Sequence, residues 1–428
     1  MQNENLPNQS RKLLQGIQGD AGIGLIVPFS TVKSYDARFY KSTHTGIWHY
    51  SKSYMGKFEY PMGVRGMTSF PDDSAATFHI AFAQKVSKAN NELVVFRHAG
   101  DSIYDLSFML DDKPAVLKYT DSTKVVFNVF GDFSNLTCKI QKSNSIQSSI
   151  TITGIVLQDS LHRGGLWHNA GVGAAPYRMV LSEAYYEQEA KFLNPDLVII
   201  DLGTNDFLYA NRIEADLRNT IITVIEKVRG ANPNADIILT DAQEMKYKGK
   251  RTTVANEFSS MMYSIAKEKN CGFWTYYHVS GGRNAWHYWA DAKLTQGDGI
   301  HLNGKGSELK GTLLFHAIDN SVSLIRNEKV NSKAMKIEDE TMNLTITSID
   351  SGTVVVDTVA NENINTSLIR KKEKIKVKDT KSPYFYIVKK NDTVGAISLK
   401  TKVPIAKIRT LNHLKNDLIK PGQKLKLK

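Results

Sequence analysis

Cysteine is scarce in this chain of 428 residues: only Cys138 and Cys271 are present. They lie far apart, in segments that the sequence pattern assigns to different domains, so neither a disulfide framework nor a cysteine metal site is expected. The two cysteines leave the redox compartment open. We expect neither a metal nor a cofactor.

Long apolar runs are also missing. No stretch approaches the roughly 18 consecutive apolar residues of a membrane span, so we expect no integral membrane segment. The first residues, MQNENLPNQSRK, lack the basic and then apolar layout of a signal peptide. No export signal is therefore visible in the sequence.

Acidic residues are outnumbered in one part of the chain. The formal net charge is +12, and residues 326–428 contain 22 Lys and Arg against 11 Asp and Glu. The basic character therefore belongs to this tail. A basic tail can contact nucleic acid, anionic lipid or an anionic cell-wall polymer, or can be a solvated face without a partner, and charge alone does not choose among them.

The length favours two to four domains, and residues 174–322 have the pattern of one α/β domain. Helix-like segments alternate with short apolar runs bounded by turn residues, as in a doubly wound parallel sheet. The expected helices span 177–193, 213–228, 254–269 and 306–318, and the expected strands span 197–200, 237–239 and 273–277.

Residues 62–160 differ from this pattern. Apolar and polar residues alternate, as at 104–110 and 125–129, and helical stretches are few. This is typical of an all-β unit of sandwich or jelly-roll size. Because residues 11–29 already have the pattern of a helix end followed by a strand at 24–27, we expect the β unit to be an insertion in the α/β domain.

The segment Gly203-Thr204-Asn205-Asp206 directly follows an expected strand. In an open α/β sheet, ligands bind beyond the carboxyl ends of the strands. An Asn side chain there can donate a hydrogen bond to a developing oxyanion, which contributes about 3–4 kcal/mol in other hydrolases. The alternative is an Asn-Asp turn that only ends the strand.

The segment Asp298-Gly299-Ile300-His301 precedes the last expected helix. A carboxylate three residues before a histidine can orient the imidazole, so that the other ring nitrogen accepts a proton from a hydroxyl nucleophile. Upstream, Gly171 lies in a turn ahead of a helix, where a backbone N–H can donate to the oxyanion. Each pattern is common by itself.

In combination these segments resemble the SGNH hydrolase family, which is named after Ser, Gly, Asn and His in four sequence blocks. Gly171 matches the Gly block, residues 203–206 match the GxND block, and residues 298–301 match the DxxH block. The resemblance implies a flavodoxin-like doubly wound fold and serine ester hydrolysis without a cofactor. It implies these catalytic residues: His301 as general base, Asp298 as its orienting partner, and Asn205 and Gly171 as oxyanion donors.

A closer resemblance is to a Bacteroidetes-type branch of the family with a β insertion. Residues 19–29 resemble the motif GNAGRGFIFPY of that branch. The resemblance covers most of residues 1–322. It implies an SGNH domain formed by residues 1–61 and 161–325, with the β domain inserted at 62–160.

The nucleophile of the family is the serine of a GDS block that ends the first strand. Gly100-Asp101-Ser102 has these letters, but the residues that follow alternate like a strand, whereas the family needs a helix there. We therefore expect the GDS block directly before Met1. The first residues fit the helix that follows it through Gln2, Leu6, Arg11, Leu13, Leu14 and Gln15, while Glu4 replaces an Asp. The alternative is a hydrolase remnant without a serine.

Residues 384–428 resemble the LysM module, a βααβ unit that binds N-acetylglucosamine-containing glycans such as peptidoglycan. Two helical stretches lie between the segments 386–394 and 419–425, with Asn391 in place of the usual Gly and Ser398 in place of the usual Ala. The alternative is a small βααβ unit without a ligand, and residues 326–383 are expected to be a basic linker with minor β structure. The resemblance implies that these residues bind the glycan: Asp392, Thr393, Asn412, Leu414 and Ile419.

Together, these resemblances favour a serine esterase of the bacterial cell envelope, in the periplasm or at the cell surface, that deacetylates O-acetylated peptidoglycan or a related glycan. The implied partner is peptidoglycan or another N-acetylglucosamine-containing glycan, and not nucleic acid. One alternative is a non-catalytic peptidoglycan-binding protein with a degenerate or truncated hydrolase domain. Another is an esterase that acts on other acetylated polysaccharides.

Overall fold

The computed structural model forms two compact units, residues 1–359 and 360–428. The described residues of the first unit are 5–26, 40–53, 60–97, 103–326, 335–336, 343–350 and 353–359. Those of the second unit are 385–389, 392–401, 403–414, 419–420 and 422–427. Within these ranges no helix is both long and apolar enough to cross a membrane.

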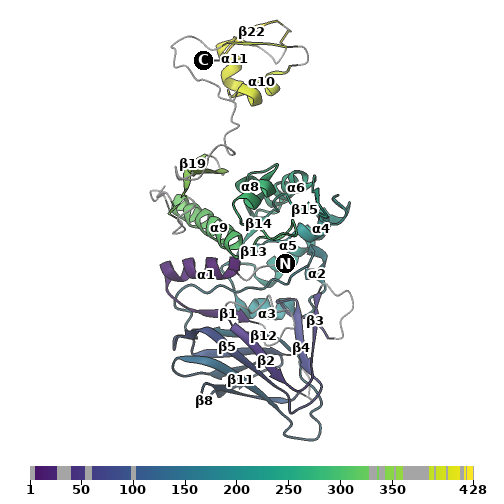
Figure 1. Ribbon diagram of the computed structural model, residues 1–428, viewed down its shortest axis with the longest axis vertical. Helices are drawn as coiled ribbons and strands as arrows, with labels where there is room; N and C mark the ends of the chain where they lie inside the picture. Colours follow the sequence, from purple (N-terminus) through teal and green to yellow (C-terminus); the bar gives the residue numbers. More distant parts are fainter. Residues whose placement is uncertain are drawn as a thin grey trace. The chain divides into compact units, whose positions relative to one another are not determined.

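A parallel sheet forms the centre of the α/β domain. Its strands are, in spatial order, β13 (Leu197–Ile200), β14 (Asp236–Thr240) and β17 (Gly272–Trp274). Ile237 and Leu239 pack on one face and Ile238 on the other, because side chains alternate along a strand. The first face is covered by α5 (Leu217–Ala231) and α6 (Ala255–Glu268), and the second by α9 (Gly304–Ile325), as shown in Figure 1. The expected doubly wound α/β layout is confirmed.

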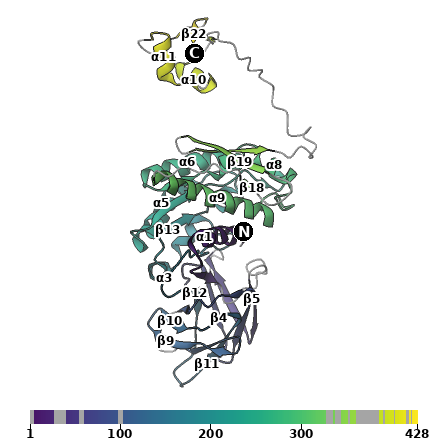
Figure 2. The ribbon, with the colours of Figure 1, turned by 90° about the vertical axis from the view of Figure 1, so that its left-hand side faces the viewer.

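The first helix, α1 (Asn5–Gln18), lies beside α9 in both ribbon views (Figures 1 and 2). Gln9 Nε2 donates to Thr312 Oγ1 at 3.2 Å, and Ser10 Oγ donates to the Gly311 carbonyl at 3.3 Å. The start of the chain therefore packs on the closing helix of the same domain.

The single helix expected over residues 177–193 is in fact two helices, α2 (Tyr177–Leu181) and α3 (Tyr186–Leu193). At the break, the Lys227 ammonium of α5 donates to the Val180 and Glu183 carbonyls, each at 2.8 Å. These side-chain bonds satisfy carbonyls that a continuous helix would otherwise satisfy. The domain also contains α4 (Thr204–Phe207), α7 (Tyr276–Val279), α8 (Ala285–Asp291) and the paired short strands β15 (Lys246–Tyr247) and β16 (Lys250–Arg251).

The all-β unit consists of two packed sheets, seen in the lower part of Figure 2. The core between them is rich in aromatic rings: Phe108 makes edge contacts with Phe78 at 6.2 Å and with Phe127 at 5.1 Å between ring centroids. The larger sheet contains β1 (Gly22–Ile26), β3 (Trp48–Lys52), β4 (Met67–Pro71), β6 (Glu92–Arg97), β9 (Val116–Thr120), β10 (Lys124–Asn128) and β12 (Ile152–Gln158). The smaller sheet contains β2 (Tyr40–Thr45), β5 (Thr77–Val86), β7 (Asp105–Leu110), β8 (Lys113–Pro114) and β11 (Phe133–Gln141).

The strand expected at residues 24–27 belongs to this β unit and not to the parallel sheet. β1 pairs antiparallel with β12. β2 belongs to the smaller β sheet and β3 to the larger one, so the β unit starts before residue 62. Leu25 packs in the core of the α/β domain, whereas its neighbour Ile26 packs between the two β sheets. A strand buried on both faces has the same apolar run as a parallel strand, and the sequence pattern cannot separate the two.

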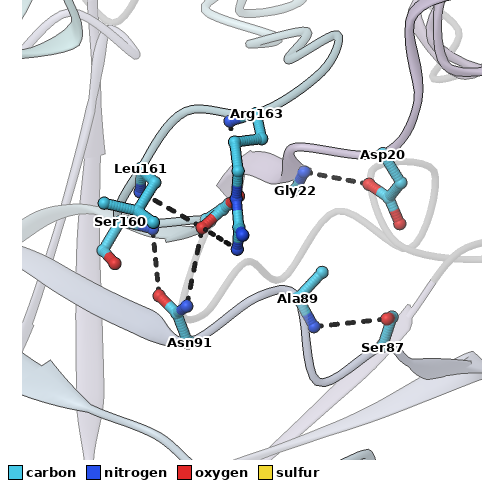
Figure 3. A network of polar contacts seen from close by, with 9 residues as sticks. Asp20, Gly22, Ser87, Ala89, Asn91, Ser160, Leu161 and Arg163 are labelled. Carbon is cyan, nitrogen blue, oxygen red and sulfur yellow. Dashed lines mark hydrogen bonds and ion pairs between the residues drawn. The ribbon is translucent and has the colours of Figure 1, made fainter.

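The chain enters and leaves the β unit at one junction (Figure 3). The Asp159 carboxylate accepts hydrogen bonds from Arg163 Nε at 2.7 Å and from the Leu161 N–H at 3.1 Å, and Figure 3 labels both donor residues. The Asp159 N–H donates to the Ala21 carbonyl at 2.8 Å. The bonds from Arg163 are the largest of the effects that lower the pKa of Asp159 to about 2. Gly22 has a φ of +139°, and a Cβ there would lie 2.5 Å from the Leu157 carbonyl oxygen. This close approach explains a glycine in the motif at residues 19–29, of which 27–29 lie outside the described residues.

A buried carboxylate joins the β unit to α3. Glu189 accepts a hydrogen bond from the Val64 N–H at 2.8 Å and another from the Thr153 hydroxyl. Its side chain also fills the space above Gly63, where a Cβ would lie 1.9 Å from Oε2. Burial raises the pKa of Glu189 to about 7, against the opposing effect of these two hydrogen bonds.

The second unit has the βααβ order expected from the sequence. Strands β21 (Phe385–Ile387) and β22 (Lys424–Lys426) pair antiparallel, and α10 (Val394–Thr401) and α11 (Ile405–Leu411) lie between them in the chain. The core of this unit is formed by Val388, Val394, Ile397, Ile408, Leu425 and Leu427. In the region expected to be a linker, an antiparallel sheet is formed by β18 (Met335–Lys336), β19 (Asn343–Asp350) and β20 (Thr353–Val359).

Candidate active site

Asp298 and His301 form a hydrogen-bonded pair in the turn before α9. Asp298 Oδ1 accepts hydrogen bonds from the backbone N–H groups of Ile300 and His301, each at 2.9 Å, and Oδ2 contacts His301 Nδ1. Burial acts to raise the pKa of Asp298, but the bonds from His301 and Ile300 outweigh it, and the pKa lies below its ordinary value. Asp298 is therefore an ionised acceptor that fixes Nδ1 as the protonated ring nitrogen. Nε2 is then the nitrogen that can accept a proton from a hydroxyl group.

Asn205 lies where β13 ends, in the short helix α4. The preceding Gly203 has a φ of +114°, and a Cβ there would lie 2.2 Å from the ring of Phe258, so the turn requires glycine. Asn205 Nδ2 donates to the Ala175 carbonyl at 3.4 Å, and the Asp206 carboxylate accepts from the Tyr177 N–H at 3.1 Å. Burial raises the pKa of Asp206 to about 7. These two bonds connect the Asn205 turn to the segment that carries Gly171.

Gly171 precedes α2 in a turn of its own. Its N–H donates to Asn169 Oδ1 at 3.2 Å, and the Asn169 carbonyl accepts a hydrogen bond from Arg65 of the β unit. The structure thus shows the Gly171 N–H within a side-chain turn. For this N–H to donate to a substrate oxyanion, the Asn169 side chain must release it.

The short hairpin β15–β16 connects the Asn205 turn to the turn of His301. The Lys246 N–H donates to the Gly299 carbonyl at 2.8 Å, between Asp298 and His301. Just after the second strand of the hairpin, Thr253 N–H donates to Asn211 Oδ1 at 2.7 Å and Asn211 Nδ2 donates to Thr253 Oγ1 at 3.0 Å. Described contacts therefore join the segments of Gly171, Asn205 and His301 into one connected group.

Sequence reasoning missed this hairpin, although its turn leaves a signal. Lys248 and Gly249 have φ values of +50° and +76°, which two-residue hairpin turns of type I′ require at both central positions. The flanking pairs of residues are too short to show the alternation of a strand. The Lys248-Gly249 dipeptide was the only available sign.

Ser102 and the two residues before it lie outside the described residues. The strand expected after Ser102 is confirmed as β7, which pairs with β11 in the smaller sheet of the β unit. A strand at this position does not provide the helix that the nucleophile turn of the family requires. The serine expected before Met1 stays a prediction. Among the described residues, no group of three or more His, Cys, Asp or Glu is arranged to hold a metal ion.

The five candidate glycan-binding residues lie in the second unit, and contacts within that unit already engage them. Asp392 Oδ2 accepts from the Tyr386 hydroxyl at 2.9 Å, and Thr393 Oγ1 accepts from the Ala396 N–H at 3.1 Å. Asn412 Nδ2 donates to the Lys426 carbonyl at 2.8 Å, and its Oδ1 accepts from the Lys426 N–H, so its amide holds β22 to the end of α11. Leu414 and Ile419 pack against the core. The glycan-binding role of all five stays a prediction.

Comparisons with known proteins agree with these two units. Residues 153–309 match the GDSL-like lipase/acylhydrolase family, and residues 386–428 match the LysM domain. A solved structure of a peptidoglycan O-acetylesterase is 19% identical with a TM-score of 0.60, over 76% of this chain and 88% of that chain. At this identity the likeness shows the fold.

Two further solved structures are similar over smaller parts of this chain. The lipase/acylhydrolase from Enterococcus faecalis is 21% identical over 36% of this chain and 75% of its own, with a TM-score of 0.30. The acetyl xylan esterase AlAXEase is 18% identical over 35% of this chain and 78% of its own, with a TM-score of 0.29. No curated protein sequence matches the chain.

Proposed function

Because the chain carries a GDSL-like lipase/acylhydrolase domain and a LysM domain, we propose that it is an esterase that removes O-acetyl groups from peptidoglycan in the bacterial cell envelope. The observation that carries the proposal is the His301–Asp298 pair, in which an ionised carboxylate orients the imidazole. The peptidoglycan O-acetylesterase with the same fold supports the choice of substrate.

In the proposed reaction, His301 Nε2 takes the proton of a serine hydroxyl as its oxygen attacks the acetyl carbonyl. Asn205 Nδ2 donates to the oxyanion of the tetrahedral intermediate, and the Gly171 N–H is the second donor. His301 then gives its proton to the sugar oxygen that leaves. Water, deprotonated by the same imidazole, hydrolyses the acetyl-serine to acetate and restores the serine.

The proposed role of the LysM domain is to hold the catalytic domain on its polymer. By family resemblance, the residues around Asp392 and Asn412 bind the glycan. A catalytic domain joined to a bound module meets acetyl groups on the same polymer at a high effective concentration. The joint presence of the two domains therefore favours a polymeric substrate over a small soluble ester.

The test is serine labelling of the native protein, purified from the cells that make it. A fluorophosphonate should label one serine, and peptide mapping should place it before Met1, as the sequence predicts, and not at Ser102. Labelled protein should no longer release acetate from O-acetylated peptidoglycan. Absence of both labelling and acetate release would overturn the esterase proposal.

A second candidate is a peptidoglycan-binding protein that does not catalyse ester hydrolysis. The hydrogen bonds of the two proposed oxyanion donors favour it, because the Gly171 N–H is bonded to Asn169 and the Asn205 amide to Ala175. Under this proposal the native protein binds peptidoglycan, is not labelled and releases no acetate.

A further inference from the structure

The β15–β16 hairpin, which connects the Asn205 turn to the His301 turn, is strongly basic. Residues 246–251 have the sequence KYKGKR, with four basic side chains in six positions. We call these six residues the basic hairpin. Its first residue, Lys246, is bonded to Gly299 in the turn of His301. Thr253, two residues after the hairpin, is bonded to Asn211, which follows the Asn205 turn in the chain.

The charges of this hairpin differ in how they are neutralised. Arg251 contacts the buried Glu244 carboxylate at 3.3 Å and Asn284 Oδ1 at 3.2 Å, so it anchors the hairpin to the domain. Lys248 and Lys250 are exposed, and no carboxylate of the described residues forms an ion pair with either one. Two positive charges therefore remain available on the hairpin whose first residue is bonded to the turn of His301.

An exposed aromatic ring lies next to the basic hairpin. Tyr209, four residues after Asn205, has 64% of its surface exposed. Its ring makes an edge contact with Tyr247 of the hairpin at 5.3 Å between centroids, and Lys248 Nζ lies 5.3 Å from the centroid of the Tyr247 ring. Tyr209 thus offers a flat apolar surface that is held by contact with a second ring and bordered by positive charge.

We propose that the basic hairpin and Tyr209 form a substrate-binding edge for a glycan that carries carboxylate groups. The proposal rests on the proposed esterase function and narrows its substrate class. Lys248 and Lys250 bind carboxylates of the substituents on the glycan, and Tyr209 packs against a sugar ring. Peptidoglycan has such carboxylates on its peptide substituents, whereas acetylated xylan backbones have none.

The alternative is that the hairpin is a solvated turn that binds no substrate. Substitutions that remove its charges and keep its backbone conformation distinguish the two. Lys248 occupies the left-handed region, which asparagine adopts more readily than most residues, so Lys248→Asn removes the charge and keeps the turn. Lys250→Gln removes the second charge. The matched control is Lys139→Gln with Lys142→Gln, two exposed lysines of the β unit, which changes the net charge by the same amount.

The experiment measures kcat/KM of the native full-length protein on three substrates: O-acetylated muropeptides, acetylated xylo-oligosaccharides and p-nitrophenyl acetate. In the variant with Lys248→Asn and Lys250→Gln, kcat/KM on muropeptides should fall about 3- to 10-fold, because two exposed ion pairs with the substrate are lost. It should keep its activity on the other two substrates, and the control variant should match wild type on all three.

Tyr209 is tested with two substitutions. Tyr209→Ala should lower kcat/KM on both glycan substrates and leave kcat/KM on p-nitrophenyl acetate unchanged. Tyr209→Phe should retain most of the activity because it keeps the ring. Equal losses on all three substrates, or no loss on muropeptides, would overturn the binding edge. If the wild-type protein hydrolyses none of them, the esterase proposal fails. Equilibrium binding of the same muropeptides then tests the edge: a loss in the lysine variant relative to its control supports it, and equal affinity overturns it.

Discussion

Asp298 receives hydrogen bonds from two backbone N–H groups and contacts one ring nitrogen, so its turn and its histidine are held by the same carboxylate. Such an arrangement sets the orientation of His301 before any substrate binds. A base oriented in advance contributes to the rate because no free energy is spent on ordering it during the reaction.

His301→Ala should reduce turnover of p-nitrophenyl acetate by the native protein by several orders of magnitude, because proton removal from the hydroxyl would be unassisted. Asp298→Asn should also reduce kcat strongly, since an amide does not hold the imidazole in the same tautomer. Steady-state kinetics at neutral pH measure both effects. Near-normal activity of His301→Ala would refute its assignment as the base.

Asn205→Ala should have a smaller effect than His301→Ala. The side chain is proposed to donate one of two hydrogen bonds to the oxyanion, and removal of one such donor lowers kcat by about 10²–10³-fold in other hydrolases. Asn211→Ala is a useful comparison, because it breaks the bonds to Thr253 without removing a donor from the site. A loss with Asn205→Ala no larger than that of the comparison variant would argue against the oxyanion role.

Short-range patterns predicted contacts within a turn better than contacts between distant segments of the chain. The spacing from Asp298 to His301 predicts their contact, because three residues on a turn determine the geometry. The bond from Arg65 to the Asn169 carbonyl joins residues that are over 100 positions apart in the chain, and no local pattern predicts it.

At the scale of elements, α3 and the β unit are joined through a carboxylate whose charge depends on pH. The folded pKa of Glu189 is about 7, above its ordinary value of 4.5, so the folded state favours the protonated form. The contribution of Glu189 to stability is therefore full below about pH 4.5 and is lost as the pH rises through about 7.

Glu189→Gln should remove this pH dependence. The amide keeps an oxygen that can accept from the Val64 N–H, carries no charge, and should make the variant more stable than wild type at pH 8 by up to about 3 kcal/mol. Urea unfolding at pH 5 and pH 8 measures the effect. Glu187→Gln, which alters an exposed residue of the same helix, is the control. A stability difference between wild type and Glu189→Gln that is the same at both pH values would contradict the assignment.

The sequence predicted α5, β13 and β14 well. The helix shows a clear period, the two strands are short apolar runs bounded by turn residues, and the structure has all three close to the expected positions. β1 was placed in the wrong sheet because it is buried on both faces. The break between α2 and α3 was missed because it depends on Lys227, a side chain of another helix.

At the scale of the whole molecule, the two units divide the proposed work between catalysis and attachment. The matches to the two families fall in different units, residues 153–309 in the first and residues 386–428 in the second. The second unit has its own buried core of apolar residues. Attachment should therefore be separable from hydrolysis.

A charge-based account and a glycan-recognition account of the second unit predict different salt dependence. A fragment of residues 360–428, the compact C-terminal unit, should sediment with purified peptidoglycan and stay bound at about 0.5 M salt, because recognition through hydrogen bonds and apolar contacts is little affected by ions. Binding through exposed lysines alone should fall steeply over the same range, since at this salt concentration charges are screened within a few ångströms. Circular dichroism of the fragment checks that it is folded. Release of a folded fragment at 0.5 M salt, together with equal binding to DNA at low salt, would show that the basic residues and not a glycan groove hold the protein on the polymer.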